Sequence, residues 1–168
     1  GTLIYGAGEQ AGHNGQNKWG GSLLFFRGNF AATAAFQQVR YDGAPGDLNS
    51  LVAGFARQTA GQLGATYDFG VVKLYGQYQY IKNTISTGDA KSNGGQLGVS
   101  IPVGPGSVLA SYAYTKTSGA ADVKRNTWAI GYDYSLSKRT DVYAAYFRDK
   151  VSDLSTADTF GVGIRAKF

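Results

Sequence analysis

The chain has 168 residues, with 25 glycines, 12 tyrosines and 9 phenylalanines but neither cysteine nor methionine. The absence of cysteine excludes disulfide bonds and thiolate metal sites. The net charge of +5 is dispersed rather than gathered into a nucleic-acid-binding patch, and no run approaches the roughly 18 apolar residues of a membrane helix.

Apolar and polar residues alternate with a period of two along most of the chain, which predicts β-strands with two different faces. The first segment opens at Gly1 without a signal peptide, so we expect a mature chain that begins partway through a larger architecture. No segment shows a helical period, so the predicted fold is all-β. The predicted strands cover residues 2–9, 18–27, 30–40, 57–69, 71–82, 94–103, 107–116, 126–136, 141–149 and 159–168.

The predicted connections alternate between short and long. Short turns fall at 28–29, around Gly70, at 104–106 and at 137–139. Longer polar loops fall near residues 10–17, 42–55, 83–94, 117–123 and 150–158. This alternation predicts an antiparallel up-and-down sheet with all long loops at one end, and argues against the Greek-key connections of a β-sandwich.

Strand length and the placement of aromatic residues indicate the solvent of the apolar face. About ten residues at about 3.3 Å each, tilted about 45°, rise about 23 Å, close to the apolar band of an outer-membrane barrel. Aromatic residues sit at the strand ends around an aliphatic middle, as the two interfaces of a bilayer favour. They are Trp19 and Phe25, Phe30 and Phe36, Tyr67 and Phe69, Tyr78 and Tyr80, and Phe160 and Phe168. We therefore expect the apolar face to lie against lipid.

Three stretches, "ATYDFGVVKLYGQYQ", "YDYSLSKRTDVYAAY" and the closing "GVGIRAKF", resemble the trimeric general-diffusion porins of Gram-negative bacteria, in their β-proteobacterial form. The resemblance covers nearly the whole chain but only the carboxyl-terminal part of a sixteen-stranded barrel. It implies a homotrimeric outer-membrane channel for passive diffusion of ions and small hydrophilic solutes. It also implies that the loop that constricts the pore belongs to the part of the barrel outside this chain. The sequence therefore does not define which ions or solutes pass.

We interpret residues 1–168 as a single transmembrane domain and as part of a larger barrel. Ten strands closing alone would give a diameter near 20 Å, a size that inward side chains fill, whereas sixteen give about 32 Å. The inward residues are mainly glycine, alanine, serine, threonine and glutamine, which suits one wall of a watery pore.

Alternation places a set of polar residues opposite the lipid-facing ones. We expect Lys73, Arg165 and Lys167 to lie near the short-turn end and to favour anions mildly, with Asp68 and the other nearby aspartates offsetting them. The predicted pore-lining residues are Lys73, Gln77, Gln79, Asp133, Asp141, Arg165 and Lys167.

A second set of bases lies on the outward face just beyond the aromatics of the long-loop end. We expect these bases to meet lipopolysaccharide phosphates, their stems packed along the aromatic residues. The alternatives are plain snorkelling or pairing with Asp149 or Asp158. The set comprises Arg40, Arg57, Lys82, Lys116, Lys124 and Arg148.

The final strand carries a further expectation drawn from the resemblance. In these porins a terminal aromatic after alternating apolar residues resembles the signal read by the outer-membrane assembly machinery. Phe160, Val162, Ile164 and Phe168 would carry it here. The alternative is that Phe168 serves only as an interfacial aromatic residue.

Other motifs carry little functional signal. "GAGEQAG" lacks the spacing of a dinucleotide loop, and the single histidine, His13, has no second ligand or catalytic partner. Loop acids at 42, 47, 89, 122 and 153 are interpreted as solvated charge rather than a cation site. We therefore expect no enzyme, metal, cofactor or nucleic-acid partner. The alternative to a channel is a non-conducting barrel that anchors or adheres through its long loops.

Overall fold

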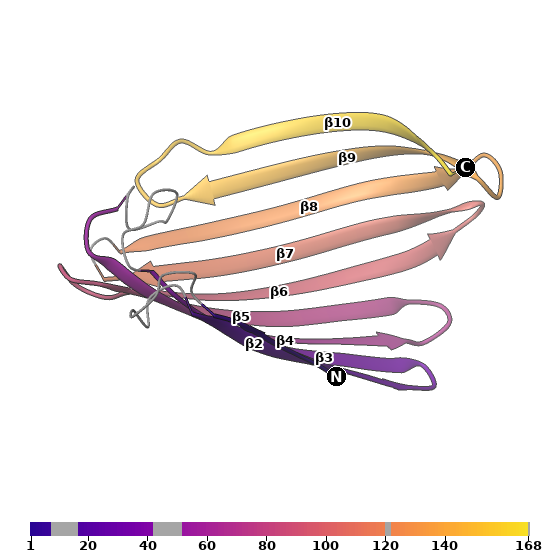
Figure 1. The fold of residues 1–168 in the computed structure, drawn as a ribbon. Coiled ribbons are helices and arrows are strands. Elements are labelled where there is room, and N and C mark those ends of the chain that lie inside the picture. Colours follow the sequence, from indigo (N-terminus) through magenta and orange to yellow (C-terminus); the bar gives the residue numbers. More distant parts are fainter. Residues whose placement is uncertain (8–16, 42–51, 120–121, 168) are drawn as a thin grey trace.

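The computed structural model describes residues 1–7, 17–41, 52–119 and 122–167. These residues form ten antiparallel strands in one sheet, in the order β1 to β10 (Figure 1). The strands are β1 (Thr2–Gly6), β2 (Lys18–Arg27), β3 (Phe30–Arg40), β4 (Phe55–Asp68), β5 (Lys73–Ile85), β6 (Ala90–Val103), β7 (Gly106–Ser118), β8 (Val123–Ser135), β9 (Thr140–Val151) and β10 (Ala157–Ala166). The all-β, up-and-down fold predicted from alternation is confirmed.

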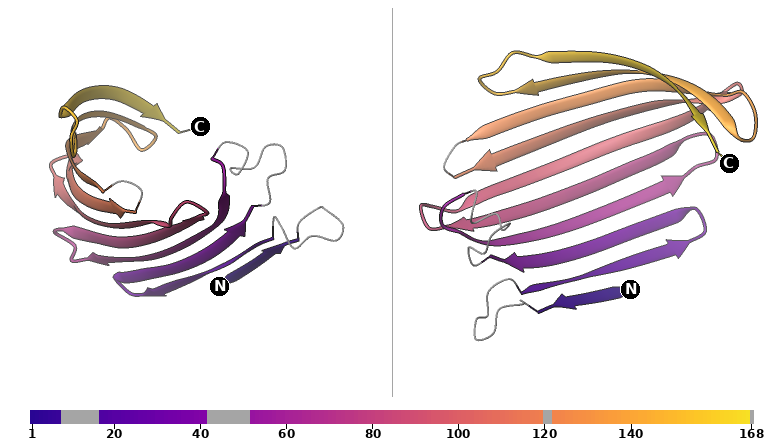
Figure 2. Two further views of the ribbon diagram at one scale, coloured as in Figure 1. Left: turned by 90° about the vertical axis from the view of Figure 1, so that its left-hand side faces the viewer. Right: turned by 45° about the horizontal axis from the view of Figure 1, so that its top comes forward.

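The sheet curves into a trough that does not close (Figure 2). Each strand pairs with its sequence neighbours, and no pairing joins β1 to β10 within the described residues. The short turns gather at one end of the trough, and the strand ends that lead into the longer connections lie at the other (Figure 1). The structure is therefore an open, partial barrel, as the small inward side chains predicted.

Two of the short turns depend on glycine. Gly28 joins β2 to β3 with φ of 57°, and Gly104 joins β6 to β7 with φ of 59°. This left-handed region is costly for residues that carry a Cβ. The turns consequently form where the sequence supplies glycine, and they hold adjacent strands in register.

Several strands extend farther toward the long-loop end than the alternation predicted. β5 continues to Ile85 and β6 begins at Ala90, so the expected loop over 83–94 shrinks to four residues. β8 likewise begins at Val123 and β9 ends at Val151. Beyond the apolar band both sheet faces meet water, so the backbone ladder persists after the hydrophobic signal has stopped. The predicted strand 2–9 ends at Gly6, and residues 8–16 and 42–51 lie outside the described part.

The described residues contain almost no protein core. Phe55 is the one buried hydrophobic side chain among them, while Leu97, Val162 and Ile164 are about 70% exposed. Such exposure along a whole sheet face would expose far more apolar area than soluble monomers leave in water. No helix in the described ranges is long and apolar enough to cross a bilayer.

Candidate functional site: the concave wall

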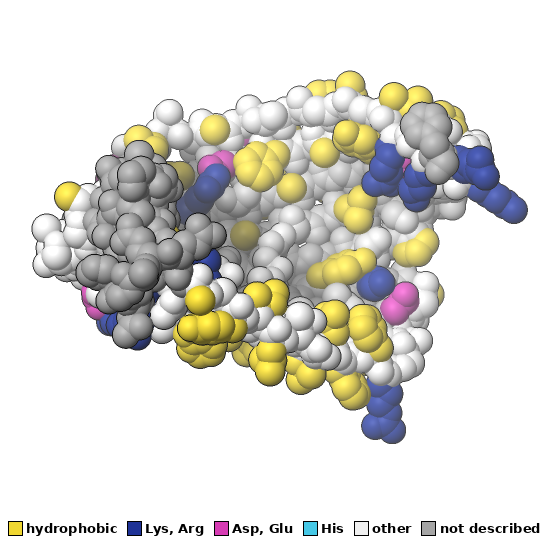
Figure 3. All heavy atoms as spheres, in the orientation of Figure 1, with side chains coloured by type: hydrophobic (Ala, Val, Ile, Leu, Met, Phe, Trp, Pro, Cys, Tyr) yellow, Lys and Arg dark blue, Asp and Glu magenta, His cyan; other side chains and the backbone are white. Residues whose placement is uncertain are grey.

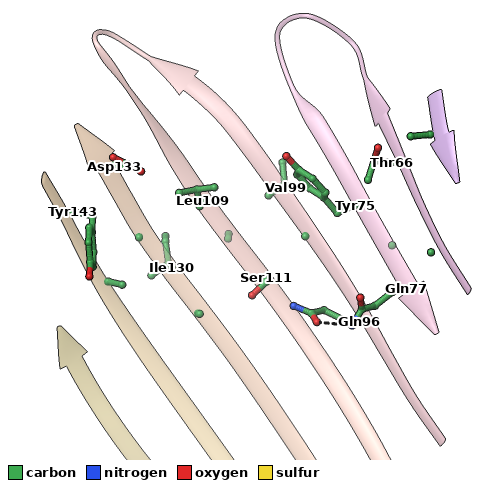
Figure 4. Close-up of a pocket in the computed structure, with 18 of the residues that line it drawn as sticks. Thr66, Tyr75, Gln77, Gln96, Val99, Leu109, Ser111, Ile130, Asp133 and Tyr143 are labelled. Carbon is green, nitrogen blue, oxygen red and sulfur yellow. Dashed lines mark hydrogen bonds between the residues drawn. The ribbon is translucent and has the colours of Figure 1, made fainter. Parts of the chain in front are cut away.

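The concave face of the sheet holds a cavity of about 1090 Å³, lined by residues from β2 to β10 (Figure 4). Alternate residues from neighbouring strands meet there, because directly paired residues share a face in an antiparallel sheet. In Figure 3 the floor of this hollow is largely white, with a few hydrophobic side chains and charged ones toward its ends. The wall thus presents amides, hydroxyls and small residues to the interior of the trough, together with a few larger side chains such as Leu109 and Tyr143.

A row of glutamines crosses the middle of this wall. The Gln62 amide donates to Gln77 at 3.5 Å. The Gln77 amide in turn donates to Gln96 at 3.2 Å, as Figure 4 shows. Gln77 and Gln96 are direct partners in the β5–β6 ladder, whereas Gln62 of β4 is the direct partner of Gln79 and reaches Gln77 diagonally. Each amide keeps further donors and acceptors free for water or a solute. Gln77 was predicted from alternation, whereas Gln62 and Gln96 were not singled out.

The strongest charge cluster lies at the short-turn end. Arg165 of β10 contacts both carboxylate oxygens of Asp141 through Nε, at 3.0 and 3.1 Å, and its Nη2 contacts Asp133 at 2.9 Å. The structure therefore brings together three of the predicted lining residues. The cluster carries a formal charge of about −1, because two carboxylates face one guanidinium. The remaining oxygen of Asp133 (Oδ1) is buried without a hydrogen-bond partner in the described residues.

Lys73 and Lys167 differ from Arg165 in their surroundings. Lys73 is paired with Asp68 across the β4–β5 ladder, but its Nζ lies over the Tyr75 ring, 5.6 Å from the centroid. Lys167 follows β10, and its backbone N–H donates to the Arg139 carbonyl. Neither ammonium forms an ion pair with a described carboxylate. These two lysines are the less neutralised cations of the predicted set.

A second charged cluster, missed from the sequence, lies toward the long-loop end of the same face. Arg125 Nε contacts Asp149 at 2.8 Å, and the Thr127 hydroxyl donates to the same carboxylate at 2.6 Å. Arg125 fell outside the strand predicted from residue 126, although it shares the parity of Thr127. This contact also shows Asp149 paired across the concave face rather than with the outward bases.

The convex face carries the aromatic residues at two levels. Trp19 packs against Phe36 with ring centroids 5.0 Å apart, and Tyr67 packs against Phe69 at 4.5 Å. Trp19 and Phe36 lie toward the long-loop end, and Tyr67 and Phe69 lie beside a short turn. The aliphatic residues between these levels, such as Ile130, are exposed. An aliphatic band between aromatic levels is the pattern of a bilayer-facing surface.

The outward bases have mixed partners. Lys82 pairs with Asp89 at 2.7 Å, and Arg148 lies 3.6 Å from Asp158. Arg40 and Arg57 are directly opposite each other in the β3–β4 ladder, and so are Lys116 and Lys124 in β7–β8. The structure therefore shows carboxylate pairing for Lys82 and Arg148. The other bases of the set form no ion pair with a described carboxylate, namely Arg40, Arg57, Lys116 and Lys124.

The remaining sequence-predicted residues are placed as follows. Gln79 lies on the concave face two residues after Gln77, and Phe160, Val162 and Ile164 lie exposed on the convex face of β10. Phe168, His13, Asp42 and Asp47 lie outside the described residues. The described part holds no cluster of three or more side chains suited to a metal ion.

An apolar convex face, two aromatic levels and a polar concave wall define a transmembrane β-barrel wall that faces lipid on one side and a water-filled interior on the other. The comparison with protein families matches residues 2–154 to a family described as Gram-negative porin. The chain belongs to this Gram-negative porin family, whose members place their barrels in the bacterial outer membrane. Family and fold indicate a channel rather than an enzyme.

Solved structures show the same fold over nearly the whole chain. The anion-selective porin from Comamonas acidovorans is 30% identical, with a TM-score of 0.79, over 92% of this chain and 50% of its own. The Salmonella typhi OmpF, solved with daunomycin, is 18% identical over 99% and 56%, with a TM-score of 0.71. OmpT of Vibrio cholerae is 14% identical over 89% and 54%, with a TM-score of 0.72.

The chain spans about half the length of these solved structures. Among curated proteins no match to the chain was found.

Proposed function

We propose that this chain forms one wall of an outer-membrane pore through which ions and small hydrophilic solutes diffuse passively. The supporting observation is the contrast between the two faces of one sheet. The concave face carries amides, hydroxyls and paired charges around a 1090 Å³ hollow, with some large apolar side chains such as Leu24 and Leu109 among them, whereas the convex face exposes rows of aliphatic and aromatic residues. A wall of this kind requires no reacting group, because transport follows the concentration gradient.

Electrical recording of the full-length protein in planar lipid bilayers tests this proposal. We expect stepwise conductance increments that grow in proportion to the salt concentration. A correctly folded full-length protein that inserts without conductance would support the alternative, a barrel that anchors or adheres through its long loops. Folding is checked independently by the β-sheet circular dichroism of the same preparation.

We propose a mild preference of this pore for anions. Lys73 and Lys167 supply positive charge on the wall without an ion pair to a described carboxylate, while Asp133 and Asp141 more than neutralise Arg165 and leave that cluster slightly negative. The 30% identity to a porin described as anion-selective supports the same sign. Converting Lys73, Arg165 and Lys167 together to glutamine should lower the anion-to-cation permeability ratio. An unchanged reversal potential in a salt gradient would contradict the assignment.

We also propose that β10 ends in the segment read during membrane assembly. Phe160, Val162 and Ile164 form an exposed apolar row on the convex face, available to a binding partner before insertion. Phe168 would complete this row in sequence. Phe168→Ala should slow insertion into the outer membrane in cells, and an unchanged insertion rate would leave Phe168 as an interfacial residue only.

We propose a homotrimer of the full-length protein as the functional unit, with lipopolysaccharide as its lipid neighbour in the outer leaflet. One solved relative with 14% identity is described in a trimer form, which supports the assembly through the shared fold. Lipopolysaccharide phosphates are anionic, and the outward bases lie on the lipid-facing side of the sheet beyond the aromatic residues. Chemical cross-linking of the full-length protein in its native membrane should yield trimers.

A further inference from the structure

The strand registers reveal a repeated arrangement on the convex face of three hairpins. In β3–β4, β5–β6 and β7–β8, two bases stand directly opposite each other at the long-loop end. These opposed base pairs are Arg40 with Arg57, Lys82 with Lys91, and Lys116 with Lys124. Lys91 was not among the bases predicted from the sequence.

The residues beneath each pair repeat as well. The first base of each pair follows an aromatic residue by four positions, after Phe36, Tyr78 or Tyr112. In the two hairpins with tyrosine, the phenol donates to an asparagine two positions after the second base. These contacts are Tyr78 to Asn93 and Tyr112 to Asn126, both at 2.8 Å. The tyrosine–asparagine hydrogen bond thus lies between the aromatic level and the two basic side chains.

Opposed bases of this kind are electrostatically unfavourable without a counter-charge. Directly opposite residues in an antiparallel pair have Cβ atoms about 4.5–5.5 Å apart, and like charges there destabilise the sheet. In β5–β6 the counter-charge is internal, because Asp89 contacts Lys82 at 2.7 Å. In β7–β8, Lys116 and Lys124 are both exposed and form no ion pair with a described carboxylate.

We propose that the Lys116–Lys124 pair is a discrete binding site for one lipid phosphomonoester, and that Arg40–Arg57, which lies beyond Phe36 without a tyrosine–asparagine contact, is a second such site. This inference rests on the proposed outer-membrane pore, whose lipid neighbour carries such phosphates. A phosphomonoester bears about −1.5 to −2 charges at neutral pH and has three acceptor oxygens, which suits two converging cations. The tyrosine beneath the pair marks the depth of the interface, where lipid phosphates lie.

The site differs from a uniform belt of surface charge in its predicted stoichiometry. Each unpaired hairpin should hold one phosphate group, and the β5–β6 hairpin should bind less because Asp89 occupies its cations. The β9–β10 hairpin should bind least, since Asp158 takes the asparagine position, accepts from Tyr146 at 2.7 Å and lies 3.6 Å from Arg148. A belt of independent charges would show no such ranking.

The test uses the full-length protein in detergent, with bisphosphorylated lipid A and fully dephosphorylated lipid A as probes. Native mass spectrometry counts the lipids bound by wild type and by the Lys116→Gln/Lys124→Gln variant. The matched control, Lys138→Gln/Arg139→Gln, removes the same charge from the short turn at the opposite end. We expect the Lys116/Lys124 variant to lose roughly tenfold or more in affinity for the phosphorylated probe, as when charge-assisted contacts are removed.

The same variant should bind the dephosphorylated probe as wild type does, and the control should leave both affinities unchanged. Equal losses in both double variants would overturn the site, because net charge alone would then explain binding. Excess inorganic phosphate provides a further arm. Inorganic phosphate could bind wild type at Lys116 and Lys124 while lipid A affinity is the same in wild type and in the Lys116→Gln/Lys124→Gln variant. In that case the ligand is free phosphate and the proposal is wrong.

Conductance recorded on the same variants separates this inference from the pore proposal. Normal conductance with unchanged lipid A affinity would refute the phosphate site and leave the pore intact. Absent conductance in wild type, with lipid A affinity lost in the variant, would refute the pore and keep the site.

Discussion

At the scale of single residues, the concave wall balances its charges locally. Arg165 touches carboxylates on two neighbouring strands, and Arg125 makes the corresponding contact at the other end. Each guanidinium forms a planar fork that matches a carboxylate, so such pairs keep a defined geometry even where water has access. The wall is therefore polar throughout without being strongly charged of either sign.

Arg165→Gln should shift ion selectivity toward cations. The substitution leaves Asp133 and Asp141 facing the pore without their guanidinium, so the local potential becomes more negative. We expect the reversal potential in a salt gradient to move toward the cation value by several millivolts or more, and less at high salt because of screening. Arg139→Gln, in the adjacent short turn, is the matched control. Equal shifts in both variants would contradict a specific role of the cluster.

The pKa of Asp89 should lie below its ordinary value, first because Lys82 donates a hydrogen bond to the carboxylate and second because of the lysine's charge. A carboxylate with a depressed folded-state pKa stabilises the fold above its ordinary value of about 3.9, and loses that contribution as the pH falls through the lower folded value. We expect Lys82→Gln to raise the midpoint of the Asp89 carboxyl titration followed by NMR, while Lys116→Gln leaves it unchanged. Equal midpoints in wild type and Lys82→Gln would contradict the pairing.

At the scale of the strand, each element separates two solvents across its faces. β8 shows this with adjacent residues. Ile130 is exposed and is paired with Ala110 and Tyr146 on the convex face, while Ala129 is paired with Ser111 and Phe147 on the concave face. Contact with lipid tails favours apolar side chains on the convex face, and contact with water in the pore favours polar side chains on the concave face. Neighbouring positions in the sequence therefore face opposite requirements.

Ile130→Arg should destabilise the folded protein in bilayers by about 2–4 kcal/mol, the cost of a charged side chain at the lipid-facing midplane of a barrel. Ala129→Arg places the same side chain one residue away, on the water-filled side, and should cost much less. Urea-dependent folding into lipid vesicles measures both free energies. A comparable loss in the two variants would mean that the convex and concave faces are misassigned.

At the scale of the whole molecule, the open sheet has two edges. β1 pairs only with β2 and β10 only with β9 among the described residues, so each edge strand leaves one row of backbone groups unpaired. In a bilayer, unpaired N–H and C=O groups cost several kcal/mol each, which restricts stable barrels to closed ones. Further strands, from a longer chain or a second copy, are needed to satisfy both edges.

A polypeptide limited to residues 1–168 should therefore not form a discrete monomeric barrel. We expect edge-to-edge association into larger species, detected by cross-linking and by the absence of a single heat-modifiable band on gels. The full-length protein under identical refolding conditions is the control. A compact, conducting monomer of residues 1–168 would show that ten strands close without partners.

The sequence by itself determined the strands, their alternation, the short turns and the aromatic levels, because each of these follows from local preferences. A strand between lipid and water must alternate along its own length, and Gly28 and Gly104 mark turns without reference to distant residues. Gln77 and Arg165 could be assigned to one face for the same reason. The strand ends could not be predicted in this way. β5 continues to Ile85 and β8 begins at Val123, in a region where both faces of the sheet meet water and the alternation is lost.

Only the tertiary structure decided which side chains meet across strands. Arg165 contacts Asp133 and Asp141 from positions 32 and 24 residues away, and Lys116 faces Lys124 only in one register of β7 and β8. These contacts depend on the stagger of neighbouring strands and on the curvature of the sheet. Both properties arise from pairing between residues that are far apart in the sequence. The alternation of apolar and polar residues assigns a residue to one face of the sheet, but it does not identify the residue opposite it on the next strand.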